Sequence, residues 1–425
     1  MPSVLRGVDH KDPVAIYRGE KVLQIAKKIF GKIRNVDQAF AIDSYYTLYL
    51  PYPLLKDIND VPKELAKNYV FFKTLLESED FARIRYSTIG DSSLSVLVAS
   101  LITTELEKSI EQLQQLAGSG SERRDLSEEE VKDIAESISR KISETADTVK
   151  SIKKLMNFGS EPGTGSVFDL EEEGEEVIKL AQLADIRAIL EILSKIPDVS
   201  GKLLRPYERY SKGEIRGFEI GGDLERVHPS EIAMPKMLFR LKLAEDKLLL
   251  YDKVLPKTLG PIYVLVDKSG SMEGEKIVWA KATLLALLMK SRKDGREFYL
   301  RFFNGMPHQL NKIGKRMRSS EFIELMKYLA RVKSGGGTDI TKAIISACDD
   351  ISSGATREVS DIVLITDGED KIASSALSKR LKDVNCRLHT VMIMGDNKDL
   401  RKISYRYLRA GRLSYKEIIQ VTDFS

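Results

Sequence analysis

Apolar residues in the first half of the chain recur every three or four positions, which is the period of an amphipathic α-helix. One such series covers residues 94–116 and another covers residues 131–156, a length of about seven helical turns. The segment between them, residues 117–124, combines glycine and serine with charged residues and is typical of a loop. We therefore expect a mostly α-helical domain over residues 1–200, with a projecting helical hairpin over about residues 92–157.

A second loop, GSEPGTG, occupies residues 159–165. No lysine follows its glycines and no strand pattern precedes it, so it is interpreted as a linker rather than a phosphate-binding loop. The acidic residues 171–173 then introduce another helix, whose apolar face continues to Leu193. Residues 201–222 are rich in glycine, tyrosine and charge, which predicts an irregular segment, and a helical pattern continues to about Tyr251. We take residues 201–259 as a connecting segment that contains a helix.

From residue 260 onwards, short apolar runs alternate with helical patterns. The predicted strands are residues 262–266, 298–303, 361–366 and 388–394. The predicted helices are residues 275–293, 320–331, 340–351, 373–384 and a last one near 400–408. This alternation predicts an α/β domain over residues 260–425 with a doubly wound, mostly parallel sheet. Ligands of such sheets bind at the carboxyl ends of the strands.

The composition is that of a soluble globular protein, with 42% hydrophobic and 31% charged residues and a net charge of +4 in a chain of 425 residues. The two cysteines, Cys348 and Cys386, exclude a disulfide framework and favour a reducing compartment. The N-terminal residues lack the apolar core of a signal peptide, and no apolar run is long enough for a membrane span. We expect a cytoplasmic protein. No Walker motif is present, so any ATP hydrolysis must come from a partner.

Three separated segments of the second half share one chemical character. They are DKSGS at residues 267–271, GGGTD at residues 335–339 and TDGED at residues 366–370. Each offers hydroxyl or carboxylate oxygens at a strand end or a helix start, where all three can face one crevice. Such hard oxygen donors suit Mg²⁺, with Mn²⁺ or Ca²⁺ as alternatives. No two of the four histidines have the spacing of zinc ligands.

The same residue types also serve as helix caps and turn formers, so the segments have a purely local explanation as well. Asp339 and Asp370 fit the role of caps or of groups that support the ligands better than that of ligands. No general base is evident near the three loops, so the site is expected to bind a partner rather than catalyse a reaction.

Residues from about 260 to the C-terminus resemble a von Willebrand factor A domain with a complete metal-ion-dependent adhesion site, because all three motifs occur in the family's order. The resemblance implies that Ser269 and Ser271 ligate the metal directly and that Asp267 and Asp367 do so directly or through water. It implies a direct bond from Thr338 in the metal-engaged state, and a glutamate or aspartate of a partner in the sixth position. The sequence departs from the pattern only at Lys268, whose side chain is expected to point away from the ion.

A narrower resemblance lies upstream. The segments GGDLERVHPSEI at residues 221–232 and LLLY at residues 248–251 are similar to the approach to the A domain in intracellular CoxE- and ViaA-like proteins. Those proteins join a helical region to an A domain and work with MoxR-type AAA+ ATPases. The resemblance implies that this chain is an adaptor or co-chaperone of such an ATPase.

RNA binding is the alternative function. The Ro autoantigen also joins a helical region to an A domain with this kind of metal site, and residues 379–416 of the present chain are basic. However, no clear repeat occurs in residues 1–200, and a set of solvated helix faces is the simpler interpretation of the basic residues.

Overall fold

The computed structural model describes residues 3–116, 127–157, 172–196, 207–256, 260–315, 317–354, 356, 361–368 and 370–423. The chain divides into two compact units. One consists of Met1–Ile196 together with Pro261–Ser425, and the other of Pro197–Gly260. The helical region and the α/β region thus belong to one compact unit.

The N-terminal part of the first unit is helical, as predicted. Two short 3-10 helices, η1 (Ile58–Asp60) and η2 (Lys63–Leu65), accompany the α-helices. The α-helices are α1 (Pro13–Phe30), α2 (Gln38–Tyr49), α3 (Ala66–Glu77), α4 (Glu79–Thr88), α5 (Ser92–Leu116), α6 (Glu128–Asn157), α8 (Gly174–Ala181) and α9 (Ala184–Ser194).

The two long helices pack against other helices of this part, and the segment that joins them lies outside the described residues. The apolar stripe of α6 is buried along most of its length, from Val131 to Met156, and α6 packs against α3, α4, α5, α8 and α9. An amphipathic helix of this length is stable here because its neighbours cover its apolar face. The helix predicted after residues 171–173 is two helices, because Leu183 between α8 and α9 has an extended backbone. The loop at residues 159–165 lies outside the described residues.

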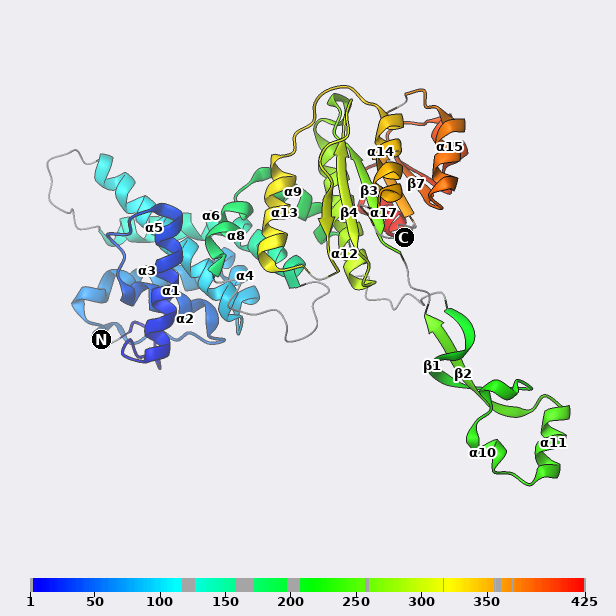
Figure 1. Cartoon of the computed structure of the whole chain (residues 1–425). Coiled ribbons are helices and arrows are strands. Elements are labelled where there is room, and N and C mark those ends of the chain that lie inside the picture. Colours follow the sequence, from blue (N-terminus) through cyan, green and yellow to red (C-terminus); the bar gives the residue numbers. More distant parts are fainter. Residues whose placement is uncertain are drawn as a thin grey trace. The chain divides into compact units, whose positions relative to one another are not determined.

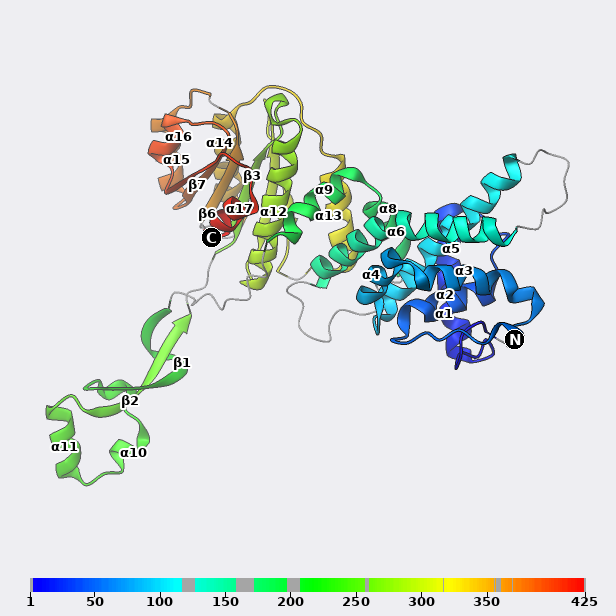
Figure 2. The same cartoon turned by 180° about the vertical axis from the view of Figure 1, so that it is seen from behind.

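The C-terminal part of the first unit is an α/β domain in which helices flank a sheet (Figures 1 and 2). The sheet has six strands in the order β5-β4-β3-β6-β7-β8. All neighbouring strands are parallel except the edge strand β5, which is antiparallel to β4. The strands are β3 (Ile262–Asp267), β4 (Phe298–Phe303), β5 (Asn311–Ile313), β6 (Asp361–Thr366), β7 (Arg387–Ile393) and β8 (Arg406–Ala410). The predicted fold class is confirmed.

The helices of this part cover both faces of the sheet. They are η4 (Gly270–Met272), α12 (Glu275–Lys293), α13 (Ser319–Arg331), α14 (Ile340–Ser352), α15 (Ser374–Asp383), α16 (Lys398–Ile403) and α17 (Tyr415–Thr422). Alternate residues of β3 enter two separate cores: Val264 faces the core of α12 and α13, and Leu265 faces that of α14 and α15. Helices α8 and α9 pack against α12 and α13, so the first core continues into the helical region.

Two strands of the sheet are not predicted by the sequence pattern. The last helix was expected near residues 400–408, but α16 ends at Ile403 and Arg406–Ala410 form the edge strand β8 beside β7. The other is β5, which has only three residues. Both lie at the edges of the sheet. An edge strand has a neighbouring strand on one side only and is often short, so it lacks the continuous apolar run that marks a central strand.

The second unit consists of an antiparallel pair, β1 (Tyr207–Gly221) and β2 (Leu248–Pro256), with η3 (Leu224–Arg226), α10 (Pro229–Ile232) and α11 (Lys236–Ala244) between them. The irregular segment expected at residues 201–222 is therefore a strand where it is described, and the predicted helix ends at Ala244 rather than near Tyr251. Among the described residues of this unit, Leu248 and Leu250 are buried, whereas the apolar residues of α11 are largely exposed. The part of this unit whose side chains are described therefore buries little apolar surface of its own.

Candidate functional site

The three predicted loops meet at the carboxyl edge of the sheet. Asp267 is the last residue of β3, and Asp367 follows directly after the neighbouring strand β6. The glycine-rich loop before α14 lies against the first loop, because the Gly270 backbone N–H donates to the Gly336 carbonyl at 3.0 Å and the Gly335 N–H donates to the Lys268 carbonyl at 2.8 Å. The parallel register of β3 and β6 therefore brings together residues about 100 positions apart.

Asp267 is completely buried and holds the first loop in shape. One carboxylate oxygen accepts the Ser269 backbone N–H at 2.8 Å, and the other accepts the Thr366 hydroxyl at 2.5 Å. Burial raises the pKa of the Asp267 carboxyl above its ordinary value, although the hydrogen bonds from Thr366 and Ser269 act in the opposite direction. A divalent cation would favour the charged form of this acid.

The two serine hydroxyls lie side by side, next to the second carboxylate. The Oγ atoms of Ser269 and Ser271 are 3.1 Å apart, and the Ser271 hydroxyl donates to Asp367 Oδ1 at 2.8 Å. The other oxygen of Asp367 accepts the Lys276 ammonium at 2.6 Å, and the same ammonium donates to the Ser271 carbonyl at 3.1 Å. Because a hydroxyl that donates its proton to a carboxylate keeps its lone pairs, both serines can still offer oxygen to a metal.

Thr338 lies next to the third loop. A Cβ placed on Gly368 would be only 3.1 Å from the Thr338 methyl group, so the glycine allows the two loops to approach closely. The Thr338 backbone is fixed by its neighbours on both sides, through the Gly336 contact described above and through the Asp339 N–H, which donates to the Asn304 carbonyl at 3.0 Å. The structure thus places Thr338 beside the third loop, and its role as a metal ligand stays a prediction.

The two other predicted acids have different positions. Asp339 caps α14, because its carboxylate accepts the Lys342 backbone N–H at 2.9 Å and pairs with the Lys342 ammonium at 2.8 Å. Asp370 is exposed, and its backbone carbonyl accepts the Asn397 side-chain amide at 2.9 Å. The cap is one of the roles that the sequence allowed for Asp339. The supporting role of both residues at a metal stays a prediction.

The donor set fits a hard divalent cation. Among the residues that the structure describes, no group of three or more histidine, cysteine, aspartate or glutamate side chains could hold a metal, so hydroxyl oxygens must complete any site here. The two carboxylates and the Lys276 ammonium give the site a net charge of −1. A bound Mg²⁺ would change this to +1 and so favour an anionic group from outside.

Three side chains that the sequence analysis did not single out contribute to this edge. Thr366 orients Asp267, Lys276 pairs with Asp367, and Asn304 donates from Nδ2 to the Gly335 carbonyl at 3.0 Å. Thr366 had a signal, since it precedes Asp367 in the third motif. Lys276 and Asn304 had none, because their partners lie on other loops and no local spacing reports such contacts.

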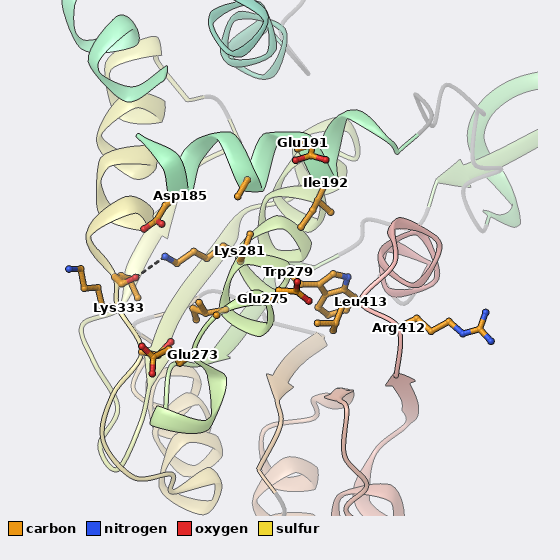
Figure 3. A pocket seen from close by; sticks show the side chains of 16 residues that line it. Asp185, Glu191, Ile192, Glu273, Glu275, Trp279, Lys281, Lys333, Arg412 and Leu413 are labelled. Carbon is orange, nitrogen blue, oxygen red and sulfur yellow. Dashed lines mark hydrogen bonds between the residues drawn. The ribbon is translucent and has the colours of Figure 1, made fainter. Parts of the chain in front are cut away.

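A cavity of about 780 Å³ lies between α9 and the start of α12 (Figure 3). The Lys281 ammonium, nearly completely buried, donates to the Val332 carbonyl at 2.7 Å, and burial lowers its pKa while the charge of Asp185 opposes this. The charged residues that line the cavity are Asp185, Glu191, Glu273, Glu275, Lys281, Lys333 and Arg412. This mixture of charges selects no ligand class. The cavity does adjoin two of the metal-site loops, since Glu273 closely follows Ser271 and Ser334 precedes Gly335.

Part of the basic C-terminal stretch is engaged within the molecule. Arg387 stacks over Tyr405 at 5.2 Å, and Arg401 stacks over Tyr407 at 5.1 Å and pairs with Asp396 at 2.9 Å. These contacts agree with the structural interpretation of the two arginines and their tyrosines.

Comparison with known proteins identifies the α/β domain. Residues 262–425 match the family model of the von Willebrand factor type A domain, and this part of the chain is such a domain. Domains of this family have a metal-dependent fold that mediates protein interactions. Among the described residues, no helix has the length and apolarity needed to cross a membrane.

Relatives extend the similarity beyond this domain. An uncharacterised protein of Methanocaldococcus jannaschii is 24% identical over 404 residues, which covers 91% of this chain and 90% of that protein. The regulatory protein ViaA of Proteus mirabilis is 24% identical over 329 residues, covering 70% of this chain and 63% of ViaA. A structure of proximal thread matrix protein 1 from the mussel byssus, with a zinc-occupied MIDAS motif, is 15% identical and covers 39% of this chain and 44% of that one, with a TM-score of 0.28. The chain thus contains a von Willebrand factor type A domain, and its similarity to ViaA extends beyond that domain.

Proposed function

We propose that the chain is a regulatory interaction protein that binds a partner through a divalent cation, preferably Mg²⁺. The metal is held by Asp267, Ser269, Ser271, Thr338 and Asp367, and a glutamate or aspartate of the partner completes its coordination. The observation that carries the proposal is the convergence of the serine hydroxyls and the Asp367 carboxylate within hydrogen-bond distance, on loops from two neighbouring strands.

The electrostatics favour binding over catalysis. The described side chains around the site are hydroxyls, two carboxylates engaged in hydrogen bonds and one ammonium that is paired with Asp367. This set supplies a cation site but places no base where it could activate a metal-bound water. The chain therefore acts, in this proposal, by holding another protein.

The proposed partner is a MoxR-type AAA+ ATPase, with this chain as its adaptor or co-chaperone. The support is the similarity to ViaA regulatory proteins, which in the Proteus mirabilis protein extends beyond the A domain. The similarity also covers the helical region in the Methanocaldococcus relative. We assign the helical region to a second contact with the ATPase assembly or its client.

The test immobilises the full chain and measures retention of the MoxR-type ATPase from the same cell, in Mg²⁺ and in EDTA. Retention is expected in Mg²⁺ only. Asp267→Asn removes a charged ligand and should weaken Mg²⁺ binding at least about 10-fold and abolish retention. Asp383→Asn, at an exposed carboxylate of α15, is the matched control and should change neither. Retention of the ATPase to the same extent in EDTA would contradict the metal-dependent mechanism.

RNA binding is tested in parallel by retention of total cellular RNA at low salt. Loss of bound RNA that rises steeply with salt would favour the alternative function.

A further inference from the structure

Two exposed methionines lie at the same sheet edge as the metal site. Met306 follows β4 and is 70% exposed, and Met394 follows β7 and is 51% exposed. Because the strand order is β4-β3-β6-β7, the metal-site loops after β3 and β6 lie between them. Neighbouring strands are about 4.8 Å apart, so three strand intervals separate the two flanking loops by about 14 Å.

The loop of Met306 is fixed to the second metal-site loop by Asn304. Its Nδ2 donates to the Gly335 carbonyl at 3.0 Å, and its backbone carbonyl accepts the Asp339 N–H at 3.0 Å. Its Oδ1 accepts the Met306 N–H at 3.1 Å, which closes the turn. One asparagine therefore links the exposed methionine to the loop that carries Thr338.

The loop of Met394 is fixed to the third metal-site loop in a similar way. Asn397 is buried, and its Nδ2 donates to the Asp370 carbonyl at 2.9 Å. Its Oδ1 accepts the backbone N–H of Leu400 at 3.0 Å. Met394 itself has a φ of 51°, in the left-handed region, a conformation that is uncommon for residues other than glycine. The backbone around Met394 is thus held in a defined shape although the side chain is half exposed.

We propose that Met306 and Met394 are the specificity-determining contacts of the metal site, and that they accept apolar side chains on either side of the partner's metal-binding acid. This inference rests on the proposed function. Methionine is flexible and polarisable, so it adapts to apolar side chains of different shape. An exposed methionine on each side of a charged site is a surface that an apolar flanking residue can cover.

The distance between the two methionine loops predicts the sequence pattern of the partner segment. Half of the distance between the flanking loops is about 7 Å, and an extended peptide rises about 3.3 Å per residue. An extended segment that runs along the sheet edge therefore places side chains two positions before and two positions after the acid next to the methionines. The partner is a protein segment of the form apolar-x-Glu/Asp-x-apolar.

The test uses two random peptide libraries, with a fixed central glutamate in one and a fixed central glutamine in the other. Each is applied to the immobilised full chain in Mg²⁺ and eluted with EDTA. We expect retention of the glutamate library only, with enrichment of leucine, methionine, isoleucine or phenylalanine at the positions two before and two after the acid. Double substitution Met306→Ser and Met394→Ser should lower retention of the enriched peptides at least fivefold and remove the apolar preference, while glutamate is still preferred over glutamine.

The matched control is Met237→Ser, at a methionine of the second unit that is 85% exposed, and it should leave the enrichment unchanged. Selection of glutamate without any apolar preference, or with the same preference in the double variant, would overturn this inference and leave the metal-binding proposal intact. Equal retention of both libraries, or of neither, would overturn the proposed function itself.

Discussion

Acidic side chains lie at both ends of the parallel sheet, but in opposite surroundings. At the amino end of β6, the buried Asp361 pairs with Arg296 at 2.8 Å, with Arg387 at 3.3 Å and with His389 at 3.2 Å. At the carboxyl end of the same strand, about 20 Å away, Asp367 is bonded to a serine hydroxyl and one lysine. Asp267 beside it is bonded to a hydroxyl and a backbone amide.

In the proposed function, this difference separates a structural acid, Asp361, from the two acids of the cation site, Asp267 and Asp367. Around Asp361, cations that belong to the protein neutralise the charge permanently and leave no position for an external ion. Around Asp267 and Asp367, the neighbours are mostly neutral donors, which stabilise the carboxylates but keep oxygen lone pairs available. A buried carboxylate with few cationic partners favours a cation from solution over any contact within the chain.

The largest effect on stability is expected at Asp361, at the amino end of the sheet. Asp361→Ala leaves the Arg296 guanidinium, whose side chain is 1% exposed, without its carboxylate. Removal of one partner of a buried ion pair costs about 3–5 kcal/mol, so the free energy of unfolding in urea should fall by that amount. Arg387→Gln, at a half-exposed partner of the same acid, should cost less than about 1 kcal/mol. Equal losses in the two variants would show that the cluster is not organised around the Arg296 pair.

The next effect is expected from the metal. Saturation of the site with Mg²⁺, at about 100 times the dissociation constant, should raise the free energy of unfolding by about 2.7 kcal/mol, and EDTA should reverse this. Thermal unfolding of the wild type and of Asp267→Asn at the same Mg²⁺ concentration measures it, and the variant, with binding weakened at least about 10-fold, should gain no more than about 1.4 kcal/mol. The Asp361 end should not respond to the ion, so the increment in Arg387→Gln should equal that of the wild type. An Mg²⁺ increment in Asp267→Asn as large as in the wild type would contradict the ligand assignment.

The smallest effect is expected at Lys276. It is a cationic partner of the kind found around Asp361, but it pairs with Asp367 at the carboxyl end of the sheet. Its ammonium pairs with Asp367 at 2.6 Å and is partly exposed, so it competes with a bound cation for the same carboxylate. Lys276→Gln should strengthen Mg²⁺ binding about three- to fivefold, a change that corresponds to less than about 1 kcal/mol. Isothermal titration calorimetry measures it, with Lys371→Gln, on the third loop but without this pairing, as the comparison. Weaker Mg²⁺ binding in Lys276→Gln would show instead that the lysine supports the occupied site.

The sequence was sufficient for the central strands and for the three loops, because buried parallel strands are continuous apolar runs and the oxygen-bearing residues follow them directly. It was insufficient where structure depends on distant pairing. The strand β1 has no recognisable strand pattern, because its segment is rich in glycine and charged residues. It forms because β2, more than 25 residues away, pairs with it. The same limit applies to Lys276 and Asn304, which meet their partners only after the sheet has formed.

The packing of α8 and α9 against later helices also affects the order in which the chain folds during synthesis. The faces of α8 and α9 that do not pack against α6 are covered by α12 and α13, and α13 ends at Arg331. While the ribosome makes the intervening 130 or so residues, those faces remain open to water and to other nascent chains. The helical region can therefore reach its final form only after the first half of the metal-binding domain has left the ribosome, and a chain that stops before that point is expected to attract chaperones.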